Sequence, residues 1–305
     1  MEPNVNDAPE AVAAGRVTGG RGPAAATGAV PAAAAGATAR STDRAVFSVR
    51  GLEFSYPGER KGCKKRIFGG LDLDLREGVV TTLIGANGSG KSTLFNLLTK
   101  NLAPDAGQIL LRGGNVADMR LQDFARLVSI VHQNNTAPAD LTVERLVNYG
   151  RVPFGGPFTP RDHDKDEAWV HWALATTHLL DRADRPVGEL SGGQRQRAWL
   201  AMALAQGSDV LLLDEPTTFL DIRYQLQILK LVRQLNRQFG ITVIMVLHDV
   251  NQAMRYSDEV VALAGGRIVA QGAPDEVVTT ELMRQVYGVG LEVARVHDEP
   301  FVLTV

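Results

Sequence analysis

The sequence predicts an α/β protein built on a central parallel sheet, with a helical lobe inserted in the middle of the chain. Short β-branched and aliphatic runs, such as VVTTLI (79–84) and VLLLD (210–214), have the length and composition of buried parallel strands. The amphipathic segment 222–239 lies between two such strands, as a helix does in a βαβ unit. The stretch from about 136 to 206 carries helical patterns and little strand signal, which predicts the inserted lobe.

Composition divides the 305-residue chain into three parts. Residues 1–44 are rich in Ala, Gly and Pro and have almost no large apolar side chains, which predicts a disordered tail. A signal peptide is the alternative, but acidic residues replace the basic start that it requires. Residues 45–290 form the predicted folded domain. The remaining residues, 291–305, predict a short β extension, a hairpin that turns at His297 to Pro300.

Charge and cysteine content exclude several classes of protein. The formal net charge of -2 gives no general attraction to nucleic acid, and we expect no nucleic-acid partner. Cys63 is the only cysteine, which excludes a disulfide within the chain and argues against a thiolate zinc site. No apolar run reaches the roughly 18–20 residues that a membrane span needs. If a membrane is involved, we expect another chain to cross it.

Two strand pairs are predicted outside the parallel sheet core. The segments 45–54 and 67–76 alternate apolar and polar residues, which predicts an antiparallel pair at the margin of the sheet. The segment 260–272 predicts a hairpin, because Gly265 and Gly266 suit a two-residue turn between its strands.

One helix of the lobe has a predicted start. Thr159 and Asp162 are spaced as a capping box, and the helix that follows is expected to run through Trp169, Trp172 and Leu179.

The segment GANGSGKST fits the phosphate-binding pattern G-x-x-x-x-G-K-[ST] and lies between a predicted buried strand and a predicted helix. Its glycines let backbone N–H groups turn toward phosphate oxygens, and the helix start adds the positive end of its dipole. Lys91 is expected on the β- and γ-phosphates, and the Ser92 hydroxyl on Mg²⁺. The predicted nucleotide-binding loop consists of Gly85, Ala86, Asn87, Gly88, Ser89, Gly90, Lys91, Ser92 and Thr93. The fold is therefore predicted to be that of a P-loop NTPase, with a RecA-like parallel sheet and an antiparallel β edge sheet.

Two adjacent acids follow the apolar run 210–213. Asp214 would be delivered to the C-terminal edge of the sheet, where ligands bind in open α/β sheets, and is expected to hold Mg²⁺ directly or through water. Glu215 lies one residue beyond and is suited to orient or deprotonate an attacking water. The alternative is that the two acids only cap a strand.

The segment LSGGQRQR (190–197) is a second helix start with exposed backbone donors, because Ser191 and Gln194 are spaced as a capping box around Gly192 and Gly193. A capped structural helix explains the spacing, but not why a second anion-ready helix start exists. Together with the preceding motifs, this segment resembles the signature motif of ATP-binding-cassette (ABC) proteins. The resemblance to their nucleotide-binding domain covers about Val46 to Gly288.

The resemblance implies further site residues. Tyr56 resembles the aromatic residue that stacks on adenine, with an ordinary core or edge-strand tyrosine as the alternative. Gln133 resembles the glutamine that links Mg²⁺ and water to the transport subunit. Asp221 lies in a segment similar to the D-loop and is also a good N-cap for the helix after it. His248 resembles the switch histidine that contacts the γ-phosphate.

The resemblance also implies how the chain works. In the family two domains pack head to tail, so that ATP lies between the P-loop of one chain and the signature helix of the other. This chain has one copy of each motif, and a homodimer would present two complete ATP sites by symmetry. We expect an active ATPase that uses ATP and Mg²⁺.

The kind of ABC protein is narrowed by what the chain lacks. Gln133 and Ser191 are 58 residues apart (191 − 133), which leaves room for a compact lobe and none for a long coiled coil. A single cassette without a membrane span is similar to the ATPase subunits of importers, which dock on a separate permease at the cytoplasmic face of the membrane and serve a substrate-binding protein indirectly. The segments that resemble the ferric-siderophore importer ATPases are 136–154, 190–206, 211–225 and 247–288. Importers of haem or cobalamin, and a non-transport ABC ATPase, are the alternatives.

Overall fold

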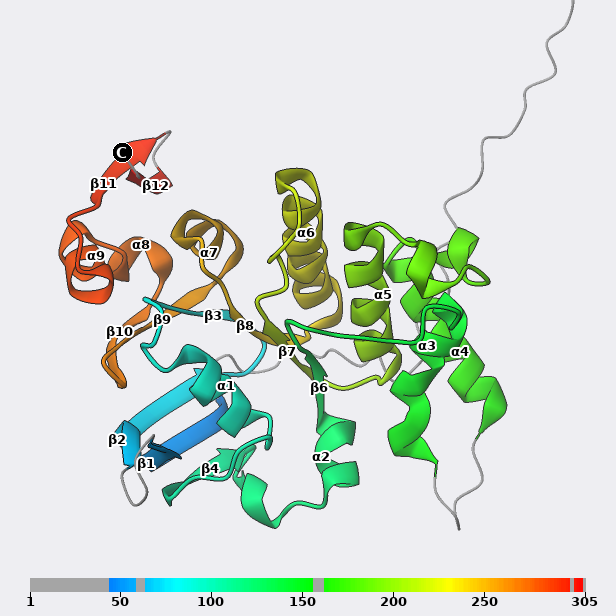
Figure 1. Cartoon of the computed structure of the whole chain (residues 1–305), viewed down its shortest axis with the longest axis horizontal. Coiled ribbons are helices and arrows are strands. Elements are labelled where there is room, and N and C mark those ends of the chain that lie inside the picture. The colour runs from blue at the N-terminus through cyan, green and yellow to red at the C-terminus, as the bar shows by residue number, and fades with distance from the viewer. Residues whose placement is uncertain (1–43, 59–63, 156–161, 297–298, 304–305) are drawn as a thin grey trace, which may run out of the picture.

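The computed structural model describes residues 44–58, 64–155, 162–296 and 299–303. The described chain forms two large sheets and a two-stranded hairpin, with helices packed around them (Figure 1). The helices α3 and α4 lie at one end of the molecule, and the C-terminal helices and hairpin lie at the other. The predicted tail up to residue 43, Cys63 and Thr159 lie outside the described residues.

The central sheet has the strand order β10-β9-β3-β8-β7-β6, and all its neighbours are parallel except the edge pair β9 and β10. Its strands are β3 (Val80–Gly85), β6 (Val128–Val131), β7 (Val210–Asp214), β8 (Thr242–Val246), β9 (Glu259–Ala264) and β10 (Arg267–Gly272). Alternate residues of each strand enter two separate hydrophobic cores, which is why these strands are apolar almost throughout. The predicted Gly265–Gly266 hairpin is confirmed, because both glycines have the positive φ of a tight turn, 53° and 73°.

A second sheet, of order β2-β1-β4-β5, is antiparallel and separate from the first. It consists of β1 (Ala45–Pro57), β2 (Lys64–Arg76), β4 (Ala106–Leu111) and β5 (Gly114–Asn115). The predicted pairing of β1 with β2 is confirmed, but its placement at the margin of the parallel sheet is wrong. The helix α1 (Lys91–Leu98) supplies the reason. It buries Leu94, Phe95 and Leu98 in the core that the antiparallel sheet shares with one face of the central sheet.

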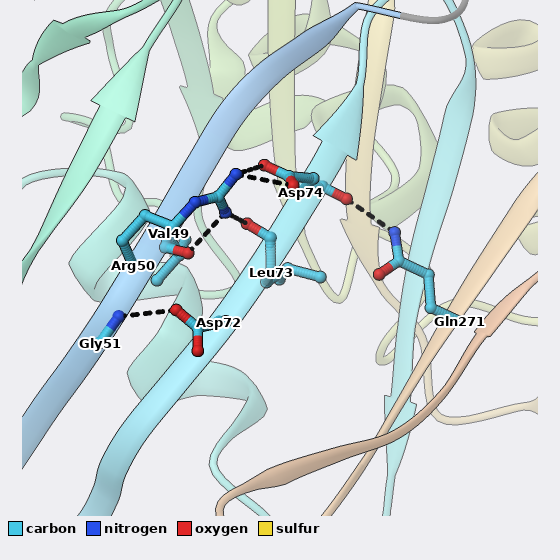
Figure 2. A network of polar contacts seen from close by, with 7 residues as sticks. All are labelled: Val49, Arg50, Gly51, Asp72, Leu73, Asp74 and Gln271. Atoms are coloured by element: carbon cyan, nitrogen blue, oxygen red, sulfur yellow. Dashed lines mark hydrogen bonds and ion pairs between the residues drawn. The ribbon is translucent and has the colours of Figure 1, made fainter.

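Polar contacts join the two sheets at one edge, as Figure 2 shows. Gln271 of β10 donates from Nε2 to the backbone oxygen of Asp74 in β2, at 2.6 Å. The carboxylate of Asp74 in turn accepts two bonds from the Arg50 guanidinium of β1, at 2.7 and 2.8 Å. Nearby, Arg76 pairs with the buried carboxylate of Glu259 at 3.1 Å. These contacts fix the antiparallel sheet over the central one, and with it the angle at which α1 enters the core.

Of the remaining helices, those between β6 and β7 form the lobe and those after β7 cover the other face of the central sheet. The helix Leu121–Leu127 instead buries Phe124 in the core shared with the antiparallel sheet. The α-helices are α2 (Leu121–Leu127), α3 (Val143–Asn148), α4 (His163–Thr176), α5 (Gly192–Ala205), α6 (Ile222–Phe239), α7 (Val250–Tyr256), α8 (Pro274–Val277) and α9 (Thr280–Tyr287). The 3-10 helices are η1 (Val116–Asp118), η2 (Tyr149–Phe154), η3 (Leu180–Arg182) and η4 (Val187–Glu189). The predicted helical character of the region from about 136 to 206 is therefore confirmed for its described residues. In the lobe the indoles of Trp169 and Trp172 pack edge to face at 5.3 Å.

The predicted capping box at the start of α4 is wrong. Asp162 is the N-cap itself, and its carboxylate accepts from the N–H of Lys165 at 3.1 Å. The helix also ends earlier than predicted, because His178 adopts a left-handed φ of 58° that an α-helix cannot continue through. Leu179 is nevertheless buried in the core, where its apolar character placed it.

The C-terminal residues form the predicted hairpin, with strands β11 (Glu292–Val296) and β12 (Glu299–Leu303). Pro300 pairs with Arg295 inside the ladder and not in the turn as predicted, and residues 297–298 lie outside the described residues. Val302 is 1% exposed and belongs to the core beneath α7, so the hairpin packs against the body of the molecule. Across the residues described, no helix combines the length and the apolar character needed to cross a membrane.

Gly150 is required where η2 meets α5, and its replacement gives a test of the packing in the lobe. A Cβ at this position would lie 2.2 Å from the backbone oxygen of Met202. We expect Gly150→Ala to lower the free energy of unfolding by about 1–3 kcal/mol, as other overpacked sites do. Gly290→Ala, where the nearest atom is 3.6 Å away, is the control and should change it by less than about 0.5 kcal/mol. Urea unfolding of both variants measures the difference, and equal stabilities would contradict this packing.

Candidate nucleotide-binding site

The predicted phosphate loop joins β3 to α1 through a run of glycines in left-handed backbone. Gly85, Gly88 and Gly90 have φ values of 155°, 79° and 109°, which L-residues with a Cβ rarely adopt. A Cβ on Gly85 would also lie 2.5 Å from the backbone oxygen of Leu263 in β9. The loop therefore needs glycine both for its turn and for its close approach to the neighbouring strand. α1 begins at Lys91, so the loop ends at a helix N-terminus, as predicted.

Lys91 is 5% exposed, and its ammonium group contacts the loop itself. Nζ donates to the backbone oxygens of Gly85 at 2.6 Å and Ala86 at 3.0 Å. Burial lowers the pKa of Lys91, and the negative charge of Glu215 opposes that shift. A buried cation held only by carbonyl oxygens is ready to exchange them for the oxygens of an anionic ligand.

Asp214 ends the buried strand β7 and presents an oxygen that no protein group satisfies. Its Oδ1 atom is buried and has no hydrogen-bond partner among the described residues. Burial raises the pKa of Asp214 to about 6; the neighbouring Glu215 adds to the shift and His248 opposes it. A partly buried carboxylate oxygen without a donor suits a hard divalent cation, so the residues fit Mg²⁺ at this position.

The Glu215 carboxylate is the meeting point of three loops. Gln133 Nε2 donates to Oε2 at 2.5 Å, His248 Nε2 lies 2.6 Å from Oε1, and Thr218 Oγ1 donates to Oε2 at 3.1 Å. Glu215 itself has a left-handed φ of 48°, a strained conformation for a residue with a Cβ. Gln133 follows β6, Glu215 follows β7 and His248 follows β8. Because parallel strands end at one edge, the predicted catalytic residues are brought together there.

Thr218 is a contact residue that the sequence analysis did not identify. A threonine three residues after an acid has no distinctive pattern, and only the turn that carries Thr218 back to Glu215 shows its contact. The backbone bond from Thr218 N to Glu215 O, at 3.2 Å, closes that turn.

The surface beside the loop is hollowed, with a volume of about 260 Å³. Tyr56, at the end of β1 and 36% exposed, forms an aromatic wall of this hollow, which Glu215 and His248 also line. Its hydroxyl lies 3.4 Å from Thr93 Oγ1, and its ring packs edge to face on Phe54. The aromatic wall, the phosphate loop and the acid are therefore arranged around one hollow. Its other lining residues are Lys65, Ile67, Asn87, Gly88, Gly90, Lys91, Ser92 and Thr93.

The signature segment does not line this hollow. Ser191 accepts from Gln194 N at 3.4 Å, and Gln194 Oε1 accepts from Ser191 N at 3.1 Å, so the predicted capping box at the start of α5 is confirmed. Gly192 and Gly193 open that helix. Asp221 caps α6 by accepting from Tyr224 N at 3.1 Å, also as predicted. These residues begin two helices, α5 and α6, and none of them is among the residues that line the hollow beside the phosphate loop.

A phosphate loop after β3, an acid pair at the end of β7 in the same sheet and a capped second helix start on one chain define an ATP-binding cassette. The profile of the family described as "ABC transporter" matches residues 68–218. The chain belongs to the ABC transporter family.

Two relatives of known name are similar to the chain over most of its length. The chain is 44% identical over 223 residues to the "Iron(3+)-hydroxamate import ATP-binding protein FhuC" of Bacillus subtilis (strain 168), covering 73% of this chain and 82% of the relative. It is 46% identical over 218 residues to the "Ferric enterobactin transport ATP-binding protein FepC" of Escherichia coli (strain K12), covering 72% and 80%.

Solved structures show the same fold. The chain aligns with cbiO1 from Clostridium perfringens, part of the ABC transporter complex cbiONQ, with a TM-score of 0.68 and 31% identity. The alignment covers 76% of this chain and 90% of that one. The predicted class, an ABC ATPase with an inserted helical lobe, is therefore confirmed.

The pKa of Asp214 gives a test of the site in the absence of ligands. Because it is raised to about 6 in the folded chain, ionisation is penalised there, and stability is lost as the pH rises from about 4 through 6. Asp214→Asn should remove that loss. The free energy of unfolding of the variant, compared with that of the wild type, should therefore be higher at pH 8 than at pH 4 by a difference on the order of 1–2 kcal/mol. Urea unfolding at several pH values, without nucleotide or Mg²⁺, measures this gain.

Asp275→Asn, at an exposed position, is the control and should show no such trend. A stability difference between wild type and Asp214→Asn that is independent of pH would mean that this carboxylate is not held in a desolvated site.

Proposed function

We propose that this chain is the ATP-hydrolysing subunit of an importer for ferric siderophores, working at the cytoplasmic face of the membrane on a separate permease. The observation that carries the ATPase part is the Glu215 carboxylate, held by Gln133, His248 and Thr218 beside the phosphate loop. The relatives named above act in iron(3+)-hydroxamate import and ferric enterobactin transport, which supports an iron chelate as the transported solute.

The site residues supply each requirement of ATP hydrolysis. The backbone of residues 85–93 and the Lys91 ammonium would bind the phosphates of ATP, with Tyr56 against the adenine. Glu215 would orient the attacking water and accept its proton, because its carboxylate lines the hollow and its charge acts on Lys91. His248 would hold Glu215 and meet the γ-phosphate.

Mg²⁺ would be held by Asp214, the Ser92 hydroxyl and Gln133. When bound, it would neutralise charge on the phosphate oxygens. The unsatisfied Asp214 oxygen is the feature of this chain that supports such a role.

The position of the signature segment supports a homodimer, because this segment does not line the hollow beside the phosphate loop of its own chain. We propose that Ser191, Gly192, Gly193 and Gln194 of a second copy close the ATP site, with Asp221 in the contact between copies. Phe219 and Ile222, which flank that aspartate, are 88% and 73% exposed, as residues of an interface between copies would be in a single chain.

Haem or cobalamin import by the same machinery, and a non-transport ABC ATPase, are the other candidates. Growth on different solutes distinguishes these candidates. A deletion strain that is supplied with the Glu215→Gln variant should fail to grow on a ferric siderophore as sole iron source. The same deletion strain supplied with the wild-type protein should grow. Both strains should grow equally on excess simple iron, which is the control.

A growth defect on haem or cobalamin in place of the siderophore would overturn the substrate. Normal growth of the Glu215→Gln strain on the siderophore, on haem and on cobalamin alike would overturn the role of this chain in import.

A further inference from the structure

The helix α7 follows His248 directly. Asp249 caps this helix by accepting from Gln252 N at 3.0 Å, so the position of α7 determines where His248 lies. Two amide side chains on α7, Asn251 and Gln252, make contacts in different directions. Both are half-buried.

Gln252 links α7 to the segment after Glu215. Its Nε2 donates to Gln225 Oε1 at 2.8 Å. Gln225, on α6, uses its own Nε2 to bond the backbone oxygens of Leu220 at 3.0 Å and Thr217 at 3.3 Å. These two oxygens flank the loop whose Thr218 hydroxyl bonds the Glu215 carboxylate. The loops of His248 and Glu215 are thus joined twice, by the direct contact of the two side chains and through two glutamines.

Asn251 links α7 to the C-terminal hairpin. Its Nδ2 donates to the backbone oxygen of Val302 at 3.0 Å, and its Oδ1 accepts from the N–H of the same residue at 2.8 Å. The Val302 side chain is 1% exposed, so β12 is anchored beneath it. The backbone N–H of Val293, in the other strand, donates to Thr280 Oγ1 at 3.1 Å. The hairpin is therefore fixed at both strands, and one of them holds α7.

We propose that Asn251, Gln252 and Gln225 are positioning residues, an amide relay that runs from the C-terminal hairpin through α7 to the loop 217–220 and sets His248 against Glu215. The inference rests on the proposed role of these two residues in ATP hydrolysis. It gives the hairpin a function in the reaction, although no hairpin residue lines the hollow. Amide side chains suit a relay, because each can donate and accept at the same time. A shift of the loop 217–220 is transmitted to His248 within the same chain.

The kinetic test uses the full chain and the variants Gln225→Ala, Gln252→Ala and their combination. Each single variant should lower kcat for ATP hydrolysis by about threefold to tenfold, the size expected for one neutral hydrogen bond. The KM for ATP should stay within about twofold, because no group that faces the hollow is changed. The double variant should be no slower than the slower single variant, because either change alone breaks the relay. Gln234→Ala is the control. Gln234 is an exposed residue of α6, and in the described part of the chain its side chain bonds only that of Gln238. The kcat of this variant should be unchanged.

An unchanged kcat in the single variants, or losses that multiply in the double variant, would overturn the relay. A purely structural role would lower the melting temperature and leave kcat of the folded protein unchanged.

Hydrogen–deuterium exchange separates a failure of the relay from a failure of the proposed function. In Asn251→Ala the amides of residues 217–221 should exchange several-fold faster, although the Asn251 side chain bonds Val302 and lies on the far side of the relay from them. Faster exchange confined to α7 and the hairpin would overturn the relay. If the wild-type chain hydrolyses no ATP, the proposed function fails, and the exchange result still decides whether the three amides are coupled.

Discussion

The site depends on one constraint: the carboxylate of Glu215 must accept from groups on three different loops while its own backbone is held in a left-handed conformation. A residue with a Cβ occupies φ 48° at a cost, and it stays there because its neighbours fix it on every side. Gln133 and Thr218 share one carboxylate oxygen, and His248 takes the other. The acid can therefore neither turn away nor be replaced by a shorter side chain without leaving three polar groups without their partner.

The scaffold explains how three loops reach one atom group. The strands β6, β7 and β8 are adjacent and parallel, so residues placed just beyond their C-terminal ends meet at one sheet edge. The sheet is buried on both faces, which fixes the strand ends to within the tolerance of a packed core. On one face α1 is clamped beneath the antiparallel sheet, and its N-terminus carries the phosphate loop to the same edge (Figure 1). The acid and the phosphate site are thus positioned by the same packing.

Much of this arrangement was predictable from sequence because it is encoded locally. The glycines of residues 85–90 are dictated by φ values that few other residues adopt, and the capping box of Ser191 and Gln194 is a pattern of four adjacent positions. The helix 222–239 was predicted to its ends, because an aspartate and a glycine mark them. By contrast, the contact of Gln133 with Glu215 joins residues 82 apart in the chain and rests on the resemblance to a family, not on spacing.

Other features could not be predicted from the sequence, because contacts between residues far apart in the chain determine them. Alternation predicted that β1 and β2 pair, but not that α1 separates them from the central sheet. The spacing of Thr159 and Asp162 predicted a capping box, and only the observed turn shows that Asp162 is itself the N-cap. The Gln252–Gln225 bond joins two helices through ordinary polar residues, which in a sequence resemble any solvent-facing side chain. Gly150 is similar, since the close approach of η2 to α5 gives no local signal.

The most direct measurement of the central claim is the single-turnover rate of ATP hydrolysis by Glu215→Gln, together with its affinity for ATP. The amide keeps the shape of the side chain and one acceptor, but it cannot take a proton from water. We expect ATP affinity to stay within a few-fold of wild type, because Lys91 and the glycine loop are untouched, while turnover falls by roughly two or more orders of magnitude. Near-normal turnover would contradict the account and remove Glu215 from the chemical step.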